Sequence, residues 1–513
     1  MQVTLICADD DIWALGMRDV SAALKRAGHQ TRMIFAGSTK ASLDAPVMEK
    51  VALLAADSDI IGISSMSRGS TRAKTIIEGL KPLKKTIVWG GMHPTLYPED
   101  CAPHADLVCR GEGEGFIVEL AERVAAGRSF TDIANGAFRD NGQLRINEPR
   151  VLIGDLDSLP FPDFAQENEY VVTGHGEVLP NLKMRQSPNI LFSGSRGCLY
   201  NCHYCSNSQL RAIYRDKGRY VRKMTVPKFV EAAKECRKTF PSATYIYFTD
   251  EDFFARPIEE IREFAAIYPK EVGLPFECMV SPRQVTDEKM ELMVKAGMWR
   301  VDVGVESGSD EIKKRIFNRP VSNEIVLRAA TAISKHPRVV AYYFFIIGNP
   351  YEQRADLLGT FGMMKSLPPP SFIRAYSLVF IPGTKLFERA CNDGIIKGIE
   401  DSGFEMDFLA GLDVTTHRWK QKNVYLNSLL FLMAGKATRS WVGLLPRPLL
   451  PLLTKPALID FCDRHPAIGN ALISLGRNAV NMRRGALALV SKVLKDNTIA
   501  YGLQFVRKKS AKK

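Results

Sequence analysis

Apolar and polar residues alternate in blocks along the first 120 residues of the chain. Two longer stretches, 16–28 and 70–83, have apolar residues at helical spacing. The short apolar runs that we expect to form strands are 2–8, 31–36, 59–65, 86–91 and 106–111. Alternation of strands and helices predicts a Rossmann-like, doubly wound parallel sheet. Ligands of such sheets bind at the carboxyl ends of the strands. The small or charged residues at those ends are Ser64, Ser65, Gly90, Gly91, Gly111, Glu112 and Gly113.

A second alternating series begins near residue 185 and ends near residue 400. Its expected strands are 189–195, 244–252, 275–282, 300–307, 339–348 and 372–384. Helical patterns follow them, for example 286–297, with Thr286 as the expected N-cap and Gly297 just past the end. Six β/α units are too few to close an eight-stranded barrel. The pattern therefore predicts an open (β/α)6 partial TIM barrel.

Two further segments differ from these series. Residues 131–184 show no clear periodicity, and Pro160 and Pro162 fall within them, so we interpret them as a linker. Beyond residue 400 the chain is expected to be mainly α-helical. The predicted fold class is thus α/β with a helical C-terminal region. The parts are residues 1–130, 131–184, 185–400 and 401–513.

Composition excludes several classes of protein. The chain is 46% hydrophobic and 24% charged, which is ordinary for a globular protein. Ten cysteines in 513 residues are too few for a disulfide scaffold, and the first residues lack the basic start of a secretory signal. There is no stretch of 18 uninterrupted apolar residues, so a membrane-spanning helix is not expected. We expect a protein of the reducing cytoplasm.

The net charge of +13 is concentrated in the C-terminal region. Residues 418–513 hold 18 Lys and Arg but 3 Asp and Glu, whereas the rest of the chain is close to neutral. The basic residues are interleaved with aliphatic ones, and Trp419 and Trp441 could lie among lipid headgroups. We expect no nucleic acid partner. This region is either a peripheral contact with the inner face of a membrane or helical packing with a solvated cationic face.

Three cysteines, Cys198, Cys202 and Cys205, follow the first expected barrel strand. Barrel active sites form at the carboxyl ends of the strands. Three thiolates within eight residues could belong to a zinc knuckle, with His203 or a remote cysteine as fourth ligand. They could instead hold an iron–sulfur cluster that leaves one metal position open. An open position is typical of a catalytic metal centre.

The spacing C-x-x-x-C-x-x-C after a first barrel strand resembles the signature of radical S-adenosylmethionine (SAM) enzymes. Further segments match that family in order: 247–254 (YFTDEDFF), 279–311, and 380–394 with Pro382, Gly383 and Thr384. The segment 348–353 departs from the family's G-x-P-G-E-T, because Tyr351 replaces the glycine. The resemblance covers about residues 185–395. It implies a 4Fe–4S cluster on the three cysteines and SAM on its open iron. The residues that it places around SAM are Tyr204, Asp250, Asp252, Arg283, Glu306 and Ser307.

Residues 1–120 resemble the cobalamin-binding domain that is fused to one class of radical SAM enzyme. The matching segments are 15–29, 57–66, 89–100 and 105–120. The resemblance implies that a corrin contacts the small residues at the strand ends and also His93. The motif Asp-x-His-x-x-Gly, whose histidine binds cobalt in many cobalamin proteins, is missing from this sequence. We therefore expect that no histidine binds the cobalt. The alternatives are a sheet that has lost its ligand or that serves only in assembly.

Together the two resemblances imply a cobalamin-dependent radical SAM enzyme. The most common activity of such enzymes would be methylation of an unactivated carbon. An electron donor such as flavodoxin or ferredoxin would be the protein partner. A cyclase or rearrangement enzyme with the same cofactors is one alternative. A non-enzymatic cobalamin-binding protein with a structural metal site is another. We expect a small-molecule substrate, lipophilic or similar to a tetrapyrrole, and no catalytic residue can be named from the sequence.

Overall fold

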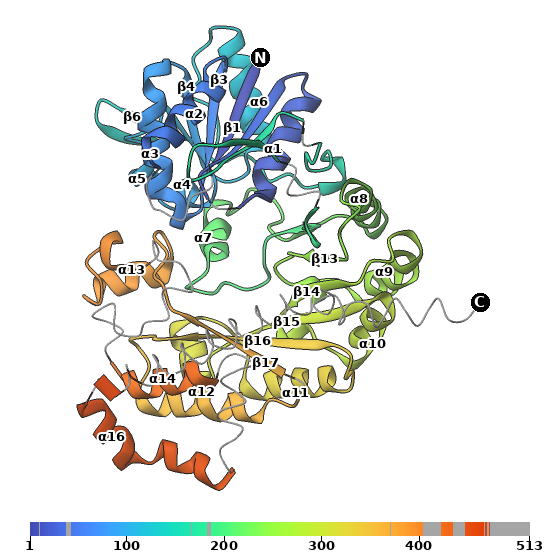
Figure 1. The fold of residues 1–513 in the computed structure, drawn as a ribbon, viewed down its shortest axis with the longest axis vertical. Coiled ribbons are helices and arrows are strands. Elements are labelled where there is room, and N and C mark those ends of the chain that lie inside the picture. Colours follow the sequence, from blue (N-terminus) through green and yellow to red (C-terminus); the bar gives the residue numbers. More distant parts are fainter. Residues whose placement is uncertain are drawn as a thin grey trace.

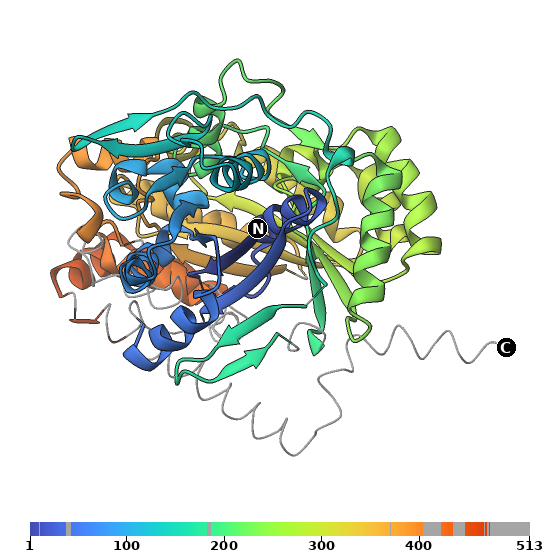
Figure 2. The same cartoon turned by 90° about the horizontal axis from the view of Figure 1, so that it is seen from above.

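The computed structural model defines two domains and part of the C-terminal region. It describes residues 1–9, 11–36, 43–165, 167–181, 186–369, 371–403, 422–433, 447–465, 467–468 and 471. The first domain lies over the sheet of the second, and helix α7 lies between them (Figures 1 and 2).

The first domain is built on a nine-stranded sheet with the order β7-β6-β5-β4-β3-β1-β2-β8-β9. Its strands are β1 (Gln2–Cys7), β2 (Gln30–Ala36), β3 (Ile60–Ser64), β4 (Thr86–Gly90), β5 (Leu107–Cys109), β6 (Gly136–Asp140), β7 (Gln143–Ile146), β8 (Glu169–Val172) and β9 (Val178–Pro180). The central strands from β5 to β8 are parallel, whereas β6, β7 and β9 pair antiparallel at the edges. The predicted parallel sheet is confirmed.

Helices cover both faces of this sheet. They are α1 (Leu15–Arg26), α2 (Ala45–Ala55), α3 (Ser70–Leu80), α4 (Met92–Leu96), α5 (Pro98–Cys101) and α6 (Glu114–Ala125). Successive strand residues point to opposite faces. Val3 and Leu5 therefore pack with α1 and α6, whereas Ile6 packs with α2 and α3 on the other face. Burial on both faces explains the continuous apolar runs in the sequence.

The segment expected to be a linker contributes four of the nine strands. Strands β6 and β7 extend one edge of the sheet, and β8 and β9 extend the other. Strand β8 is held by a buried ion pair, in which Arg18 Nη1 lies 2.7 Å from Glu169 Oε1. The sequence pattern missed these strands because they are only three to five residues long. Strands β7 and β9 are also largely exposed and therefore carry no apolar run.

The second domain has a six-stranded sheet with the order β10-β13-β14-β15-β16-β17. Its strands are β10 (Asn189–Phe192), β13 (Tyr245–Phe248), β14 (Phe276–Val280), β15 (Met298–Glu306), β16 (Val340–Ile347) and β17 (Ser371–Ser377). All five pairings are parallel, and β10 and β17 remain at opposite edges. The predicted open (β/α)6 barrel is confirmed. A small antiparallel pair, β11 (Ser195–Arg196) and β12 (Arg222–Lys223), lies beside it.

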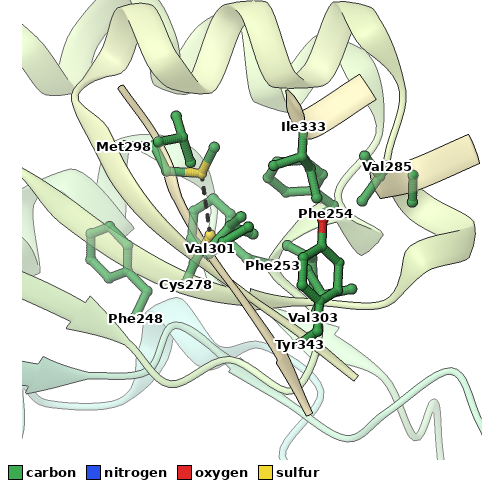
Figure 3. Packing of buried hydrophobic residues seen from close by; sticks show 14 of the residues in the cluster. Phe248, Phe253, Phe254, Cys278, Val285, Met298, Val301, Val303, Ile333 and Tyr343 are labelled. Atoms are coloured by element: carbon green, nitrogen blue, oxygen red, sulfur yellow. Dashed lines mark hydrogen bonds between the residues drawn. The ribbon is translucent and has the colours of Figure 1, made fainter. Parts of the chain in front are cut away.

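The barrel helices cover the convex side of this sheet (Figure 1). They are α8 (Val226–Thr239), α9 (Ile258–Glu271), α10 (Asp287–Ala296), α11 (Asn323–Ser334) and α12 (Arg354–Ser366), whereas α7 (Ser206–Ile213) and α13 (Lys385–Asn392) lie toward the first domain. A π-helical turn covers Ile312–Ile316. Side chains of one strand face, such as Val301, Val303 and Tyr343, pack against these helices in one core (Figure 3). Cys278 lies in this core, with its Sγ 3.8 Å from Met298 Sδ.

The described part of the C-terminal region packs on the barrel. Helix α14 (Val424–Met433) contacts α12, β16 and β17, and α16 (Pro456–Arg464) contacts α14. Asn427 of α14 accepts a 2.8 Å hydrogen bond from the backbone of Gly348. No helix in the described ranges is long and apolar enough to cross a membrane. Trp419, Trp441 and most of the basic tail lie outside the described residues, so membrane contact stays a prediction.

Candidate active site

The three-cysteine loop runs from β11 to the first turn of α7. Gly197, which precedes Cys198, has a φ of +86°, and a Cβ there would lie 2.5 Å from the carbonyl oxygen of Tyr220. Only glycine suits both constraints. The backbone of Cys205 donates to the carbonyl of Cys202, and Arg211 donates to the carbonyl of Cys198. These contacts fix the loop at the carboxyl end of β10.

The three thiols could hold a single metal ion or a cluster, and the two need different sulfur spacings. Zinc bound by thiolates at about 2.3 Å would hold the sulfur atoms about 3.8 Å apart. Among the described residues, the only three or more ligand atoms within 4.8 Å of one another belong to His93, Asp100 and Cys101. The three loop thiols do not form such a compact group in the described residues, so no single-ion site is preformed at the loop.

Burial keeps the loop thiols protonated in the absence of a positive partner. It raises the pKa of Cys198 to about 12 and that of Cys205 to about 11, and it also raises the pKa of Cys202. Two side chains reach the sulfur atoms. Arg319 Nη1 lies 3.8 Å from Cys202 Sγ, and Asn207 Nδ2 lies 3.8 Å from Cys205 Sγ. Such donors would stabilise thiolates once a metal has displaced the protons.

Arg319 is a site residue that the sequence analysis missed. Its guanidinium donates to the carbonyl of Gly304 at 2.8 Å and lies 3.7 Å from Glu306 Oε1. Burial raises the pKa of Glu306, whereas Arg319 and the Tyr204 hydroxyl lower it. Glu306 also has a φ of +70°, an uncommon conformation for a residue with a side chain. Arg319 lies in an irregular segment after the π-helical turn, where no periodic signal could have indicated it.

Ser307 and Arg283 are placed differently from the other predicted SAM residues. Ser307 is fully buried, and its hydroxyl lies 3.3 Å from both Glu352 Oε1 and Thr360 Oγ1. The Ser307 hydroxyl therefore links the end of β15 to the α12 segment by hydrogen bonds and does not face open space. Arg283 is exposed on the turn after β14 and is not among the described residues that line a pocket near the cysteines.

The acidic segment after β13 is split between two environments. Asp250 and Asp252 are buried and accept hydrogen bonds from the backbones of Gly194 and Ser281. Burial raises the pKa of Asp252 to about 7. Asp250 Oδ1, Asp252 Oδ2 and Arg319 Nε are buried without a hydrogen-bond partner. Unsatisfied buried atoms of this kind indicate a missing ligand or water. Glu251, which the sequence analysis did not select, is exposed and lines the cavity described next.

One cavity of about 500 Å³ lies between the two domains. The first domain lines it with the loops after β3, β4 and β5, including Ser64, Ser65, Gly90, Gly91, Gly111, Glu112 and Gly113. The barrel lines it with Gly197, Asn207 and Glu251, among others. Gly197 and Asn207 lie within two residues of Cys198 and Cys205. The carboxyl ends of both sheets therefore open into the same space.

His93 corrects the prediction for the first domain. Its side chain is fully buried beneath the loops and is not among the described residues that line the cavity. Its Nδ1 lies 3.2 Å from Ser67 Oγ, and its Nε2 lies 3.0 Å from Asp100 Oδ2. Both ring nitrogens are thus engaged, so His93 supports the loop after β4 from behind the residues that line the cavity.

Charged contacts hold the cysteine loop against the first domain. Arg196, two residues before Cys198, forms ion pairs with Asp19, Glu112 and Glu114. Arg222 of β12 also pairs with Glu112, at 2.7 Å. These groups are largely buried, where removing one partner of an ion pair is costly. The network therefore fixes the relative position of the two halves of the cavity.

Gly111 lies where the first domain contacts Tyr214 of the second, a role that its position in a Gly-rich loop does not indicate. The backbone N–H of Glu112 donates to the Tyr214 hydroxyl at 2.7 Å. A Cβ at Gly111 would lie 1.8 Å from that hydroxyl oxygen. The missing side chain therefore allows Tyr214 of the second domain to reach the first.

Gly111→Ala is expected to destabilise the domain interface. Its φ of +88° already disfavours alanine, and the clash with Tyr214 adds to this cost. Gly142→Ala is a matched control, because its φ is +81° and nothing lies within 4 Å. We expect about 1 kcal/mol for the control and about 3 kcal/mol or more for Gly111→Ala, measured by thermal unfolding. Equal losses would show that Tyr214 does not constrain this position.

The concave face of the barrel sheet carries aromatic pairs. The rings of Tyr342 and Phe372 stack at 5.0 Å and 20°, and those of Phe344 and Tyr376 at 5.8 Å and 5°. The Arg374 guanidinium lies 5.0 Å from the Tyr342 ring centre. These stacked rings and the nearby cation make this face of the two strands strongly aromatic.

Comparison with known proteins agrees with this geometry. Residues 192–362 match the radical SAM superfamily, and residues 1–121 match the B12 binding domain. The fold and the paired matches define a radical SAM enzyme with a cobalamin-binding domain. The chain therefore contains a radical SAM domain and a B12 binding domain, which imply a 4Fe–4S cluster, SAM and cobalamin as cofactors.

Several curated relatives are similar over much of the chain. An uncharacterized methyltransferase of Pyrococcus horikoshii is 28% identical over 66% of this chain and 71% of its own length. Cytidylyl-2-hydroxyethylphosphonate methyltransferase of Streptomyces wedmorensis is 25% identical over 57% of this chain and 58% of its own length. Anaerobic magnesium-protoporphyrin IX monomethyl ester cyclase of Rubrivivax gelatinosus is 25% identical over 68% of this chain and 61% of its own length.

Solved structures share the fold. OxsB, a cobalamin-dependent SAM radical enzyme with aqua-cobalamin and SAM bound, superimposes with a TM-score of 0.63 and 16% identity over 99% of this chain and 83% of its own. The radical SAM methyltransferase TsrM from Kitasatospora setae gives a TM-score of 0.61 and 16% identity over 76% of both chains. At 16% identity, this structural similarity shows a shared fold, including the arrangement of the two domains.

Proposed function

We propose that this chain is a cobalamin-dependent radical SAM methyltransferase that acts on an unactivated carbon of a small molecule. The observation that carries the proposal is the cavity lined by both the Gly-rich loops of the first domain and the residues beside the cysteine loop. Two cofactors that act on one substrate must face the same space. The names of the methyltransferase relatives support the same reaction.

We assign the 4Fe–4S cluster to Cys198, Cys202 and Cys205, and the open position to SAM. The residues present fit this assignment, because three thiols and several unpartnered buried polar atoms surround one loop. Arg319 suits the carboxylate of SAM, and Glu306 suits its amino group, so the pair would orient the methionine part. Asp250 and Asp252 would each accept a further hydrogen bond through the oxygen that has no partner.

We assign cobalamin to the loops after β3, β4 and β5. Gly91 has a φ of +107°, and a Cβ there would lie 2.6 Å from the carbonyl oxygen of Ser65, so the two loops touch through backbone alone. Such a floor lets a flat macrocycle approach closely. Because His93 is engaged beneath this floor, it offers no nitrogen to a metal in the cavity. When bound, the cluster with SAM supplies one-electron cleavage of the sulfonium, and cobalamin supplies a methyl group.

The protein's own contribution is to orient these groups and to exclude water. Leu210 and Tyr214 of the α7 segment and Leu152 of the connecting segment close the cavity with apolar surface. The ion pairs of Arg196 hold the two walls together. Exclusion of water protects reactive intermediates from side reactions.

A cyclase or rearrangement activity is the second candidate, because one relative that matches 68% of this chain is named a cyclase. The same cavity would serve either reaction. The two candidates differ in whether a methyl group is transferred. The first predicts that label from methyl-labelled SAM enters the product, and the second predicts that it does not.

The test is an anaerobic incubation of the reconstituted protein with methyl-labelled SAM, a reductant and a cell extract. We expect label in one small metabolite, together with 5′-deoxyadenosine and S-adenosylhomocysteine. Formation of 5′-deoxyadenosine with a modified but unlabelled metabolite would favour the cyclase. Absence of both products, with all cofactors bound, would contradict the proposal.

We further propose a lipophilic substrate, similar to a tetrapyrrole, because Leu152, Leu210 and Tyr214 line the interdomain cavity with apolar surface. Contact of the basic tail with an anionic membrane would bring such a substrate to the enzyme. Helices α14 and α16 pack on the barrel, so a chain that ends at residue 471 is the suitable truncation. Full-length and truncated chains should differ in sedimentation with anionic liposomes, and equal binding would exclude the membrane contact.

A further inference from the structure

Two hollows outside the interdomain cavity flank the cysteine loop. The first, of about 360 Å³, is lined by Cys198, Leu199, Arg211 and Arg219, among others. The second, of about 340 Å³, is lined by Asn201, Arg211, Arg215 and Lys385, among others. Both share Arg211 and Tyr220, so they are neighbouring parts of one surface. We call Leu199, Arg211, Arg215, Arg219 and Lys385 the α7 surface.

The α7 surface is cationic and lacks compensating ion pairs. Arg215, Arg219 and Lys385 are exposed, and none of them has a carboxylate within 4.0 Å among the described residues. Nearby Lys217, by contrast, pairs with Glu148. Asp216 is the exposed acid of the same segment, and the acids Asp250 and Asp252 in the first hollow are buried. This local excess of positive charge stands out on a chain whose first 417 residues are close to neutral.

The same surface lies next to the cysteine loop. Leu199, between Cys198 and Cys202, is 48% exposed. Arg211 donates to the carbonyl of Cys198, and its guanidinium stacks on the Tyr220 ring at 4.7 Å. An exposed apolar residue close to exposed cations is typical of a protein-binding site. A partner seated there would be separated from the cluster site only by the loop itself.

We propose that an acidic one-electron carrier protein docks on the α7 surface and reduces the cluster. The inference rests on the proposed function, in which cleavage of SAM consumes one electron per event. One electron passes from the reduced carrier to the oxidised cluster, so the carrier is oxidised by one electron and no atom is transferred. Complementary charge would bring the carrier to the loop and orient it.

The test compares charge-reversed holoenzymes with a reduced bacterial flavodoxin as the probe. Arg215→Glu/Arg219→Glu is the test variant. Arg328→Glu is the control, because Arg328 is exposed on α11, at the far side of the barrel (Figure 1). Stopped-flow absorbance gives the second-order rate constant for cluster reduction. We expect it to fall on the order of tenfold at low salt in the test variant, with a weaker dependence on salt, and to remain unchanged in the control.

A small chemical reductant separates docking from damage to the cluster. With titanium(III) citrate, both variants should reduce at the wild-type rate. An unchanged flavodoxin rate in the test variant, an equal loss in the control, or an equal loss with titanium(III) would overturn the proposal. If the carrier reduces the cluster normally but no methylated product forms, the proposed function fails while the docking site stands.

Discussion

Replacing Cys198, Cys202 or Cys205 by alanine is expected to remove the iron–sulfur cluster and, with it, all cleavage of SAM. Three ligands are the minimum for a cluster that leaves one iron open, so the loss of any one exposes a second iron. Iron should fall from about four atoms per chain toward zero after anaerobic reconstitution. Bound cobalamin should persist, because its proposed loops belong to the other domain.

Cys391→Ala is the matched control for this prediction. Cys391 is also partly exposed, but it lies in α13, outside the cysteine loop. It should keep full iron, sulfide and SAM cleavage. Retention of about four irons by any of the three loop variants would show that another residue completes the cluster. Binding of zinc without sulfide by the wild-type protein would instead support the structural metal site.

Replacing Arg319 by alanine has the second largest expected effect. Arg319 is buried, reaches Cys202 Sγ and the carbonyl of Gly304, and is the cation beside Glu306. Removing it would leave Glu306 in a buried site without its partner, which typically costs 3–5 kcal/mol. The pKa of Glu306, already raised by burial, would rise further. We expect about a 100-fold loss in SAM cleavage and weaker SAM binding.

A second substitution shows whether the effects of Arg319→Ala come from the uncompensated charge of Glu306 or from lost packing around Arg319. In the Arg319→Ala background, Glu306→Gln removes the uncompensated charge and should recover part of the thermal stability but not SAM binding. Arg315→Ala is the matched control, because the exposed pair of Arg315 with Glu311 should contribute less than about 1 kcal/mol. Normal SAM binding by Arg319→Ala would contradict the assigned role of Arg319.

The elements that define the site were predictable where the sequence pattern is strong. Buried parallel strands give continuous apolar runs, so both sheets and the loops at their carboxyl ends could be located. The Cys198–Cys205 spacing indicated the cysteine loop as a candidate site, since its three proposed ligands are close in sequence. Seven of the eight residues predicted around cobalamin line the interdomain cavity.

Features that depend on distant contacts were not predictable. Strand β8 is held by Arg18, about 150 positions earlier in the chain, and its own apolar run is only three residues long. Arg319 reaches Cys202 across 117 positions, and Gly111 is constrained by Tyr214. His93 matched the expected motif, yet its two nitrogens bond to Ser67 and Asp100. In each case tertiary packing decides the role.

The central claim is that the cluster and cobalamin face each other across one cavity. Electron paramagnetic resonance on the reconstituted chain, with reduced cluster and cob(II)alamin, tests it directly. We expect magnetic coupling between the two centres, which should disappear in Cys198→Ala while the cobalt signal remains. Full occupancy of both cofactors with two uncoupled signals would contradict the shared cavity.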